Sequence, residues 1–333
     1  MSASTNVTQG SVLESRFLLT EKLAEGGMSI VYKAKDLRHD EEPVAVKVPK
    51  AVYASGTGAW SMFQQEVAIG MRLDHPYVLK FLPANDAKRG SYVVTEYVPG
   101  PTLAQRLEAE RVIPEAGARQ IASQLCEALE HIHERGYVHY DLKPANVILC
   151  PNGTIRLIDF GLAHAAVGGR FSLSGALPML GTAEYVAPEQ ILRKRGRNSA
   201  DVYGVGAILY EMVTGQLPFP GDDPFRVASA RLIGDPVAPS RLTAHVSPAV
   251  EDIILRALRR NPGERYLDMT SFKAALDNPN AIHIANFRDR LQPATRARKV
   301  LRVVRHVAMI AVVPILIQVI LFLWLWHYLA NTR

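Results

Sequence analysis

The stretch VHYDLKPANVIL, residues Val138–Leu149, decides the fold and the chemistry expected of this chain. Its polar residues Asp141, Lys143 and Asn146 lie in a short loop that runs into an apolar strand. A Pro-Asn-Gly turn then leads into a second strand, which ends at IDFGLA with Asp159. Two carboxylates and an amide therefore meet at the mouth of one hairpin. Such oxygen atoms suit Mg²⁺ and can accept a hydroxyl proton.

Two upstream segments add a glycine-rich turn and a lysine. LAEGGMSIVYKA, at residues 23–34, predicts two strands joined by a turn in which Gly26 and Gly27 let a ligand approach the backbone N–H groups. Taken alone, such glycines are also typical of an ordinary hairpin. Lys47 lies in the apolar strand PVAVKV, where its charge is costly unless it is paired. Glu66 is the candidate partner, although either residue alone reads equally well as a surface charge.

The coarse pattern of the chain changes near residue 110, from β-rich to helical. Short strands are expected before this point, with one helix among them at 60–73, and helices dominate from Pro114 onward. The expected strands are Phe17–Leu23, Ile30–Lys35, Val44–Val48, Leu79–Ala84 and Ser91–Glu96, and the hairpin after the deciding stretch pairs Val147–Leu149 with Ile155–Ile158.

These motifs, taken in order, resemble the eukaryotic-like (Hanks-type) bacterial serine/threonine protein kinases. The glycine-rich turn, VAVK, a helix-borne Glu, HYDLKPAN, DFG, GTAEYVAPE and DVYGVG all occur between about residues 17 and 275. The resemblance implies an α+β, bilobal protein-kinase fold with a β-rich N-lobe and a helical C-lobe. It also implies transfer of the γ-phosphate of ATP to Ser or Thr hydroxyls of proteins, with ATP and Mg²⁺ (or Mn²⁺) as cofactors.

The resemblance also assigns roles residue by residue. Asp141 would accept the hydroxyl proton and Lys143 would steady the γ-phosphate, while Asn146 and Asp159 would bind the metal. Lys47 would hold the phosphates and pair with Glu66. The other nucleotide-binding positions implied are Ala24, Glu25, Gly26, Gly27, Met28 and Ser29 in the turn, Thr95, Glu96 and Val98 in the hinge, and Val31, Ala45 and Ile148 around adenine. Glu189 with Arg265 would form a buried ion pair, and Asp201 would brace the loop.

Two residues depart from the family pattern. Tyr140 stands where many members have an Arg that pairs with a phosphorylated activation loop, so we expect activity that does not depend on phosphorylation of Ser172, Ser174 or Thr182. Gly70 stands one turn after Glu66, where an apolar side chain usually packs on Phe160. Either the glycine leaves a gap, so that Gly70→Leu raises basal activity, or Met71 or another neighbour fills the space.

The charge of the chain is concentrated near its C-terminus. The net charge is +6, and seven Arg and Lys against one Asp lie between Arg288 and Arg305. The rest is close to neutral, which argues against nucleic-acid binding. Residues 307–329 contain no Asp, Glu, Lys or Arg and would span about 34 Å as a helix, enough for a bilayer. The alternative is a buried core helix.

The expected organisation follows from these features. Residues 1–16 are expected to be disordered and to carry no signal peptide. The kinase domain is expected at 17–275 (N-lobe 17–98, C-lobe 99–275), followed by a basic linker at 276–306, a transmembrane helix at 307–329 and a short external tail at 330–333. The positive-inside rule places the kinase domain in the cytoplasm, on a single-pass anchor in the cell membrane.

Several alternatives stay open at this level. The basic linker either sets topology alone or also binds anionic lipid. Expected partners are proteins with Ser or Thr acceptors and a second copy of the chain in a homodimer. A nucleotide-binding pseudokinase scaffold is the main rival function, and a small-molecule kinase of related fold is a second.

Overall fold

Alternating apolar residues build the N-terminal sheet of the computed structural model, which describes residues 7–27, 29–50, 58–83, 92–160, 164–165, 184–192 and 197–291. The sheet is antiparallel, with strand order β1-β2-β3-β4-β6-β5. Its strands are β1 (Val12–Leu13), β2 (Phe17–Glu25), β3 (Ser29–Asp36), β4 (Glu42–Pro49), β5 (Phe81–Leu82) and β6 (Val93–Glu96). The five strands expected from the sequence are present, although β5 and β6 are shorter than expected. Strand β1 is an additional strand, and it lies within residues 1–16, which were expected to be disordered.

The two faces of this sheet have different neighbours. On one face, Tyr32, Ala34, Val44 and Val46 belong to a small core of their own. Side chains alternate along a strand, so Val31, Ala45 and Lys47 lie on the opposite face. The apolar pattern of the sequence therefore determines which side of the sheet is open to a ligand.

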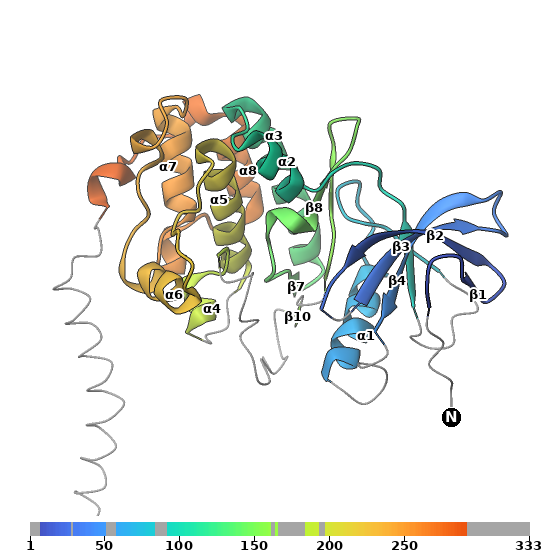
Figure 1. Cartoon of the computed structure of the whole chain (residues 1–333). Helices are drawn as coiled ribbons and strands as arrows, with labels where there is room; N and C mark the ends of the chain where they lie inside the picture. The colour runs from blue at the N-terminus through green and yellow to red at the C-terminus, as the bar shows by residue number, and fades with distance from the viewer. Residues whose placement is uncertain are drawn as a thin grey trace, which may run out of the picture.

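Helix α1 (Gly58–Gly70) lies beside the sheet and belongs to the main core of the molecule (Figure 1). Its Phe63 and Ile69 are buried in the same cluster as residues of the helical lobe, such as Val138 and Leu157. The segment after α1 is also bound to that lobe, because Leu157 N–H donates to Tyr77 O (2.8 Å) and Leu79 N–H donates to Leu157 O (3.0 Å). The helix that carries Glu66 is thus held from both lobes.

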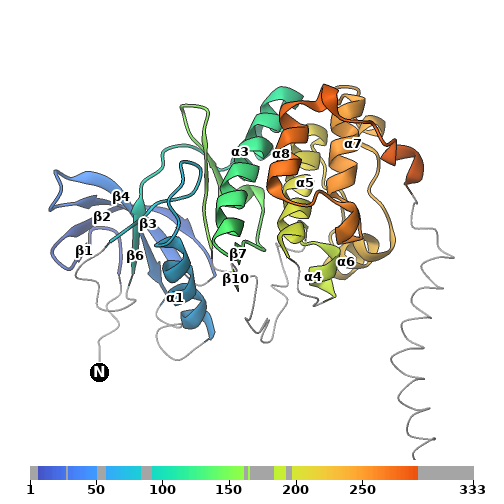
Figure 2. The same ribbon diagram turned by 180° about the vertical axis from the view of Figure 1, so that it is seen from behind.

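The helical lobe is built around α5, which is buried along most of its length. Helix α3 packs against α5 and α8 (Figure 2). The helices are α2 (Leu103–Glu110), α3 (Glu115–Glu134), α4 (Pro188–Ile191), α5 (Asn198–Thr214), α6 (Pro224–Ile233), α7 (Pro248–Ala257) and α8 (Met269–Asp277). Two short antiparallel pairs join them: β7 (Tyr137–Val138) with β10 (His164–Ala165), and β8 (Val147–Leu149) with β9 (Ile155–Leu157).

A glycine makes the close contact at the hinge between the lobes. Gly100 has φ +131°, and a Cβ there would lie 2.0 Å from the carbonyl oxygen of Leu149. Leu149 N–H donates to Pro101 O at 2.9 Å, so the hinge lies directly on β8. Only glycine allows this approach of two backbones.

The chain beyond α8 remains bound to the helical lobe up to Leu291. The 3₁₀ turns η5 (Pro279–Ala281) and η6 (Phe287–Arg290) lie against α7. The buried carboxylate of Asp252 accepts the N–H groups of Ala285 (2.9 Å) and Phe287 (2.8 Å). We name this contact the Asp252 clamp.

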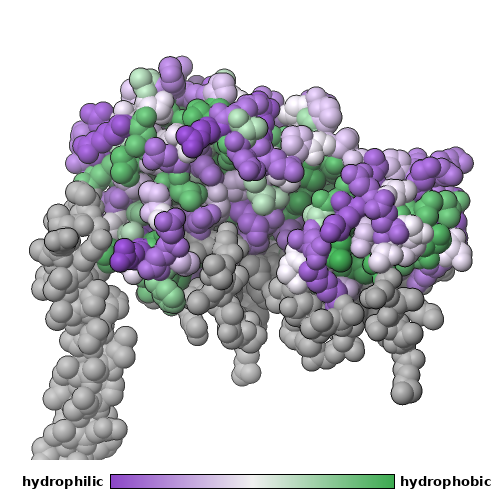
Figure 3. Space-filling view, in the orientation of Figure 1, coloured by the Kyte–Doolittle hydropathy of each residue, from purple (hydrophilic) through white to green (hydrophobic). Residues whose placement is uncertain are grey.

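Across the described ranges, no helix has the length and apolar character needed to cross a bilayer. The expected span at 307–329 lies outside those ranges, as do residues 1–6, 292–306 and 330–333. Figure 3 shows hydrophilic residues over most of the visible face of both lobes, with hydrophobic residues scattered among them.

Candidate active site

An ion pair links the sheet to α1 where the two lobes meet. Lys47 Nζ, on β4, donates to both carboxylate oxygens of Glu66, on α1, at 2.6 and 2.7 Å. The Lys47–Glu66 pairing expected from the sequence is therefore present. Asp159 Oδ1 lies 3.7 Å from the same ammonium, so three segments that are distant in sequence meet at Lys47.

Lys47 stays charged in this setting. Burial alone would lower the pKa of Lys47, but the carboxylates of Asp159 and Glu66 outweigh burial and raise it. A cation held between two carboxylates at this junction can bind a phosphate oxygen when a ligand enters.

A second group of polar residues forms around Asp141. Lys143 Nζ donates to Asp141 Oδ2 at 2.8 Å, and Asn146 Nδ2 donates to the Asp141 carbonyl oxygen at 2.9 Å. Asp141 is 7% exposed, and its Oδ1 is buried with no hydrogen-bond partner among the described residues. A buried acceptor without a partner is costly, so this oxygen is suited to a donor supplied by a ligand.

The β8–β9 hairpin connects the residues around Lys47 with the residues around Asp141. Ile158 N–H donates to the Asn146 carbonyl oxygen at 2.9 Å, which places Asp159 next to the Asp141 loop. Because the Asn146 amide nitrogen is bound to Asp141, its amide oxygen is the atom left for a metal ion. Asp159 is 39% exposed in its side chain. One amide oxygen and one accessible carboxylate fit Mg²⁺, which takes few protein ligands and completes its shell with phosphate and water.

No group of three or more His, Cys, Asp or Glu able to hold a metal occurs within the described segments. A site made of Asn146 and Asp159 does not require such a group, since ligand oxygens supply the remaining positions.

Asp201 supports the backbone of the Asp141 loop, as expected. Its carboxylate accepts the N–H groups of His139 and Tyr140, both at 2.9 Å, and contacts His133 Nε2 at 2.8 Å. Burial alone would raise the pKa of Asp201, but the hydrogen bond from His133 and the nearby histidines lower it. Asp201 is 1% exposed and anionic, and it holds the backbone on which Asp141 sits. Sequence reasoning did not identify His133.

Tyr140 lies in the hydrophobic core, where many family members have a charged Arg. It is 8% exposed within the main hydrophobic cluster and has φ +63°. Gln190 Nε2 donates to its carbonyl oxygen at 3.2 Å. The side chain has no charge to offer a phosphate.

The glycine-rich turn is closed by a hydrogen bond from Gly26 N–H to Ser29 O (2.9 Å). A Cβ on Gly26 would meet only Ser29 O at 3.7 Å, and one on Gly27 would meet nothing within 4 Å. The protein itself therefore leaves room above both glycines. Glu25 contacts Lys50 and Lys22, whose hydrogen bonds lower its pKa to about 2. Met28 lies outside the described residues.

Of the expected adenine-binding positions, Val31, Ala45 and Thr95 lie on neighbouring strands of the sheet. Ala45 pairs with Thr95 and Val31 pairs with Lys47 across neighbouring strands. Ile148 bridges to Thr102 just after the hinge, which includes Val98. Glu96 also links the lobes, because its Oε1 accepts from Arg156 Nε at 3.1 Å, a contact that the sequence did not predict.

The expected gap beside Gly70 does not exist. A Cβ on Gly70 would lie 2.4 Å from the ring of Phe81, so that ring already fills the space. Met71 does not fill it, since Met71 is 50% exposed. The centroid of the Phe81 ring lies 6.2 Å from that of Phe160 in a tilted pair, and the centroid of Phe160 lies 5.5 Å from that of His139 in an edge-to-face pair. Of the two alternatives, the gap is therefore wrong, and the filling of the space by a neighbour other than Met71 is confirmed, since Phe81 of β5 occupies it.

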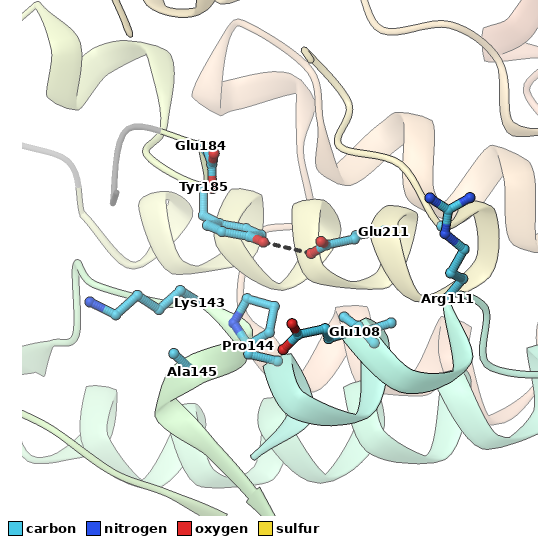
Figure 4. Close-up of a pocket in the computed structure, with 11 residues that line it drawn as sticks. Glu108, Arg111, Lys143, Pro144, Ala145, Glu184, Tyr185 and Glu211 are labelled. Carbon is cyan, nitrogen blue, oxygen red and sulfur yellow. Dashed lines mark hydrogen bonds between the residues drawn. The ribbon is translucent and has the colours of Figure 1, made fainter. Parts of the chain in front are cut away.

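A pocket of about 490 Å³ adjoins the Asp141 loop (Figure 4). Lys143 and Pro144 lie on one side of it, and Tyr185 and Glu211 face each other on the other. Tyr185 Oη donates to Glu211 Oε2 at 2.6 Å, and burial raises the pKa of Glu211. Tyr185 belongs to the GTAEYVAPE segment, whose Thr182 is outside the described residues.

The expected buried ion pair between Glu189 and Arg265 is present, with both contacts at 2.7 Å.

The molecule has a sheet-rich lobe and a helical lobe. Lys47, Glu66, Asp159 and the Asp141 loop are linked at their junction, and together these features define a protein-kinase domain. The family model of the protein kinase domain matches residues 17–279, and the chain belongs to this family.

Among similar proteins is the serine/threonine-protein kinase PknB of Mycolicibacterium smegmatis, 36% identical over 268 residues, which cover 79% of this chain and 43% of that protein. PknB of Mycobacterium tuberculosis is 34% identical over 81% of this chain and 44% of its own length. The serine/threonine-protein kinase PknL of Mycobacterium bovis is 33% identical over 81% of this chain and 67% of its own length. The chain thus spans less than half the length of the PknB proteins that it matches.

Proposed function

We propose that this chain is a serine/threonine protein kinase that transfers the γ-phosphate of ATP to Ser and Thr hydroxyls of proteins. The observation that carries the proposal is the state of Asp141: one carboxylate oxygen is bound by Lys143, and the other is buried without a described partner. That oxygen is suited to accept the hydroxyl proton of an acceptor side chain.

The remaining roles follow from the positions of the side chains. Lys47, fixed by Glu66, binds the phosphates, and the turn from Ala24 to Ser29 covers them with backbone N–H groups. Lys143 neutralises charge on the transferred group, and Tyr185 and the pocket beside Lys143 receive the acceptor chain. The catalytic contribution is positioning and electrostatic, because little covalent chemistry is required of the protein.

We assign the metal to Asn146 and Asp159. When bound there, Mg²⁺, or Mn²⁺ in its place, would neutralise charge on the phosphate oxygens. The amide oxygen of Asn146 and the exposed carboxylate of Asp159 support this assignment, as does membership of a family that uses ATP and a divalent metal.

The choice of Ser and Thr over Tyr acceptors rests on two observations. Lys143 in the Asp141 loop fits the serine/threonine branch, and the PknB and PknL relatives are named serine/threonine-protein kinases. Thr182 in the GTAEYVAPE segment also fits the serine/threonine branch by its place in the sequence.

The proposal is tested by phosphotransfer to protein mixtures, with phosphosites read by mass spectrometry. The wild-type protein should label Ser and Thr residues. The phosphotransfer rate of Asp141→Asn should be at least about a thousandfold lower, because the variant lacks the proton acceptor. The rival pseudokinase scaffold would bind nucleotide without turnover. ATP turnover that is abolished in Asp159→Asn excludes that rival, whereas labelling that is unchanged in both variants contradicts the proposed roles.

We further propose that residues 307–329 anchor the chain in the cell membrane, with the kinase domain in the cytoplasm. The apolar span and the preceding basic residues support this. A chain ending at residue 306 should move from the membrane fraction to the supernatant and keep its activity on soluble acceptors. Release of the full-length chain by high salt alone would contradict a spanning helix.

We also propose that activity does not depend on phosphorylation of the activation loop. The buried, uncharged Tyr140 supports this, because it cannot pair with a phosphate as Arg does. Phosphatase treatment should leave the rate within about threefold. A tenfold or larger loss of rate would contradict the proposal.

A further inference from the structure

A buried arginine of α6 holds the segment that forms one wall of the pocket. Arg231 is 1% exposed. Its Nη1 donates to Val186 O at 2.7 Å, and its Nη2 donates to Glu184 O at 2.6 Å. The guanidinium also lies 5.7 Å from the centroid of Phe219 and 5.9 Å from that of Tyr203, so aromatic faces keep it in place.

The two carbonyl groups that Arg231 binds flank Tyr185. Arg231 thus holds the peptide group directly before Tyr185 and the one that follows Val186, so the backbone is tied down on either side of Tyr185. The phenol of Tyr185 forms the pocket wall opposite Lys143 (Figure 4). The planar guanidinium can bind two carbonyl groups at once, whereas a lysine ammonium presents a single point charge on a flexible stem.

We propose that Arg231 is a positioning residue for the protein acceptor. It keeps Tyr185 and its hydrogen bond to Glu211 in the orientation that shapes the pocket. This inference rests on the proposed kinase function, since it assumes that an acceptor chain enters there. Arg231 binds the segment that lines the pocket through Glu184 and Tyr185, so its loss should affect the acceptor and not ATP.

The test compares Arg231→Lys with Arg226→Lys in the full-length chain, kept in detergent, with casein as the acceptor. Both changes are made in the same helix, but the Arg226 side chain is 88% exposed. In Arg231→Lys the KM for casein should rise about tenfold, while the KM for ATP stays within twofold. Arg226→Lys should leave both constants unchanged. Arg231→Gln is a second variant, and thermal melting reports the folding of each.

The outcomes distinguish a failure of the proposed kinase function from a failure of the positioning role of Arg231. If wild type labels neither casein nor itself, the proposed function fails. If wild type is active and Arg231→Lys is folded with an unchanged KM for casein, or with both KM values raised together, the positioning role fails. Loss of the fold in both Arg231→Lys and Arg231→Gln also overturns the inference, because Arg231 would then support the whole lobe.

Discussion

At the scale of single residues, Asp201 shows how one buried carboxylate organises the site. It bonds two successive backbone N–H groups and His133, so replacing it leaves several donors unsatisfied. Leaving a buried donor unsatisfied costs roughly 1–3 kcal/mol. We expect Asp201→Asn to lower the free energy of unfolding by this order and to slow phosphotransfer.

The pH dependence of this loss follows from the lowered pKa of Asp201. A carboxyl whose pKa is lower in the folded state stabilises the fold above its ordinary value of 3.8, and that contribution is lost as pH falls. The difference in unfolding free energy between wild type and Asp201→Asn should therefore be full at pH 7 and shrink below about pH 4. Urea unfolding at a series of pH values measures it. A difference that stays constant down to pH 3 would assign the effect to packing alone.

Gly100 tests the close approach at the hinge. Gly100→Ala places a Cβ 2.0 Å from Leu149 O, whereas Gly153→Ala, also at positive φ, meets nothing within 4 Å. Both variants incur backbone strain of about 1–2 kcal/mol from the positive φ. Only Gly100→Ala adds a clash, which is with Leu149 of β8. Gly100→Ala should melt at a clearly lower temperature than Gly153→Ala and bind a fluorescent nucleotide more weakly. Equal behaviour of the two would remove the clash from the explanation.

At the scale of elements, α1 and β5 are matched through Gly70 and Phe81. Because the Phe81 ring lies where a Cβ of Gly70 would be, Gly70→Leu must displace α1 or the ring. Displacing α1 moves Glu66 away from Lys47. We expect Gly70→Leu to lower phosphotransfer tenfold or more, whereas the alternative of a gap beside Gly70 predicted a higher basal rate.

The reciprocal change provides the control for this pair. Phe81→Leu reduces the ring to a smaller side chain, so the double variant Gly70→Leu with Phe81→Leu should recover part of the lost rate. Non-additivity of this kind is what contacting residues show. If Gly70→Leu alone raises the rate, α1 is loosely held despite the contact.

The site residues, Phe81 and Arg231 show which contacts could be predicted from the sequence and which could not. Lys47, Glu66, Asp141 and Asp159 each stand in a recognisable motif, and the pairs among them follow once the motifs are ordered. Phe81 carries no such signal, since β5 is only two residues long and its partner is a glycine. Arg231 was missed because it binds backbone carbonyl groups 45 and 47 positions away, a contact that leaves no pattern in side chains.

At the scale of the whole molecule, the Asp252 clamp fastens the segment after α8 to the helical lobe. Asp252→Ala removes the acceptor of Ala285 and Phe287 N–H and should release the chain up to Leu291. Limited trypsin digestion should then cleave after Arg288 and Arg290 several-fold faster than in wild type. Activity on casein should not change, and equal cleavage rates would show that other contacts hold the segment.

The clamp also determines the length of the tether under the proposed membrane anchor. With Leu291 bound, residues 292–306 are the only chain between the folded domain and the apolar span. Fully extended they reach at most about 50 Å, and freeing 285–291 would add about 25 Å. A catalytic domain confined to so thin a layer meets other proteins of the same membrane at effective concentrations on the order of millimolar. Such a kinase would select its substrates by their height above the bilayer as well as by their sequence.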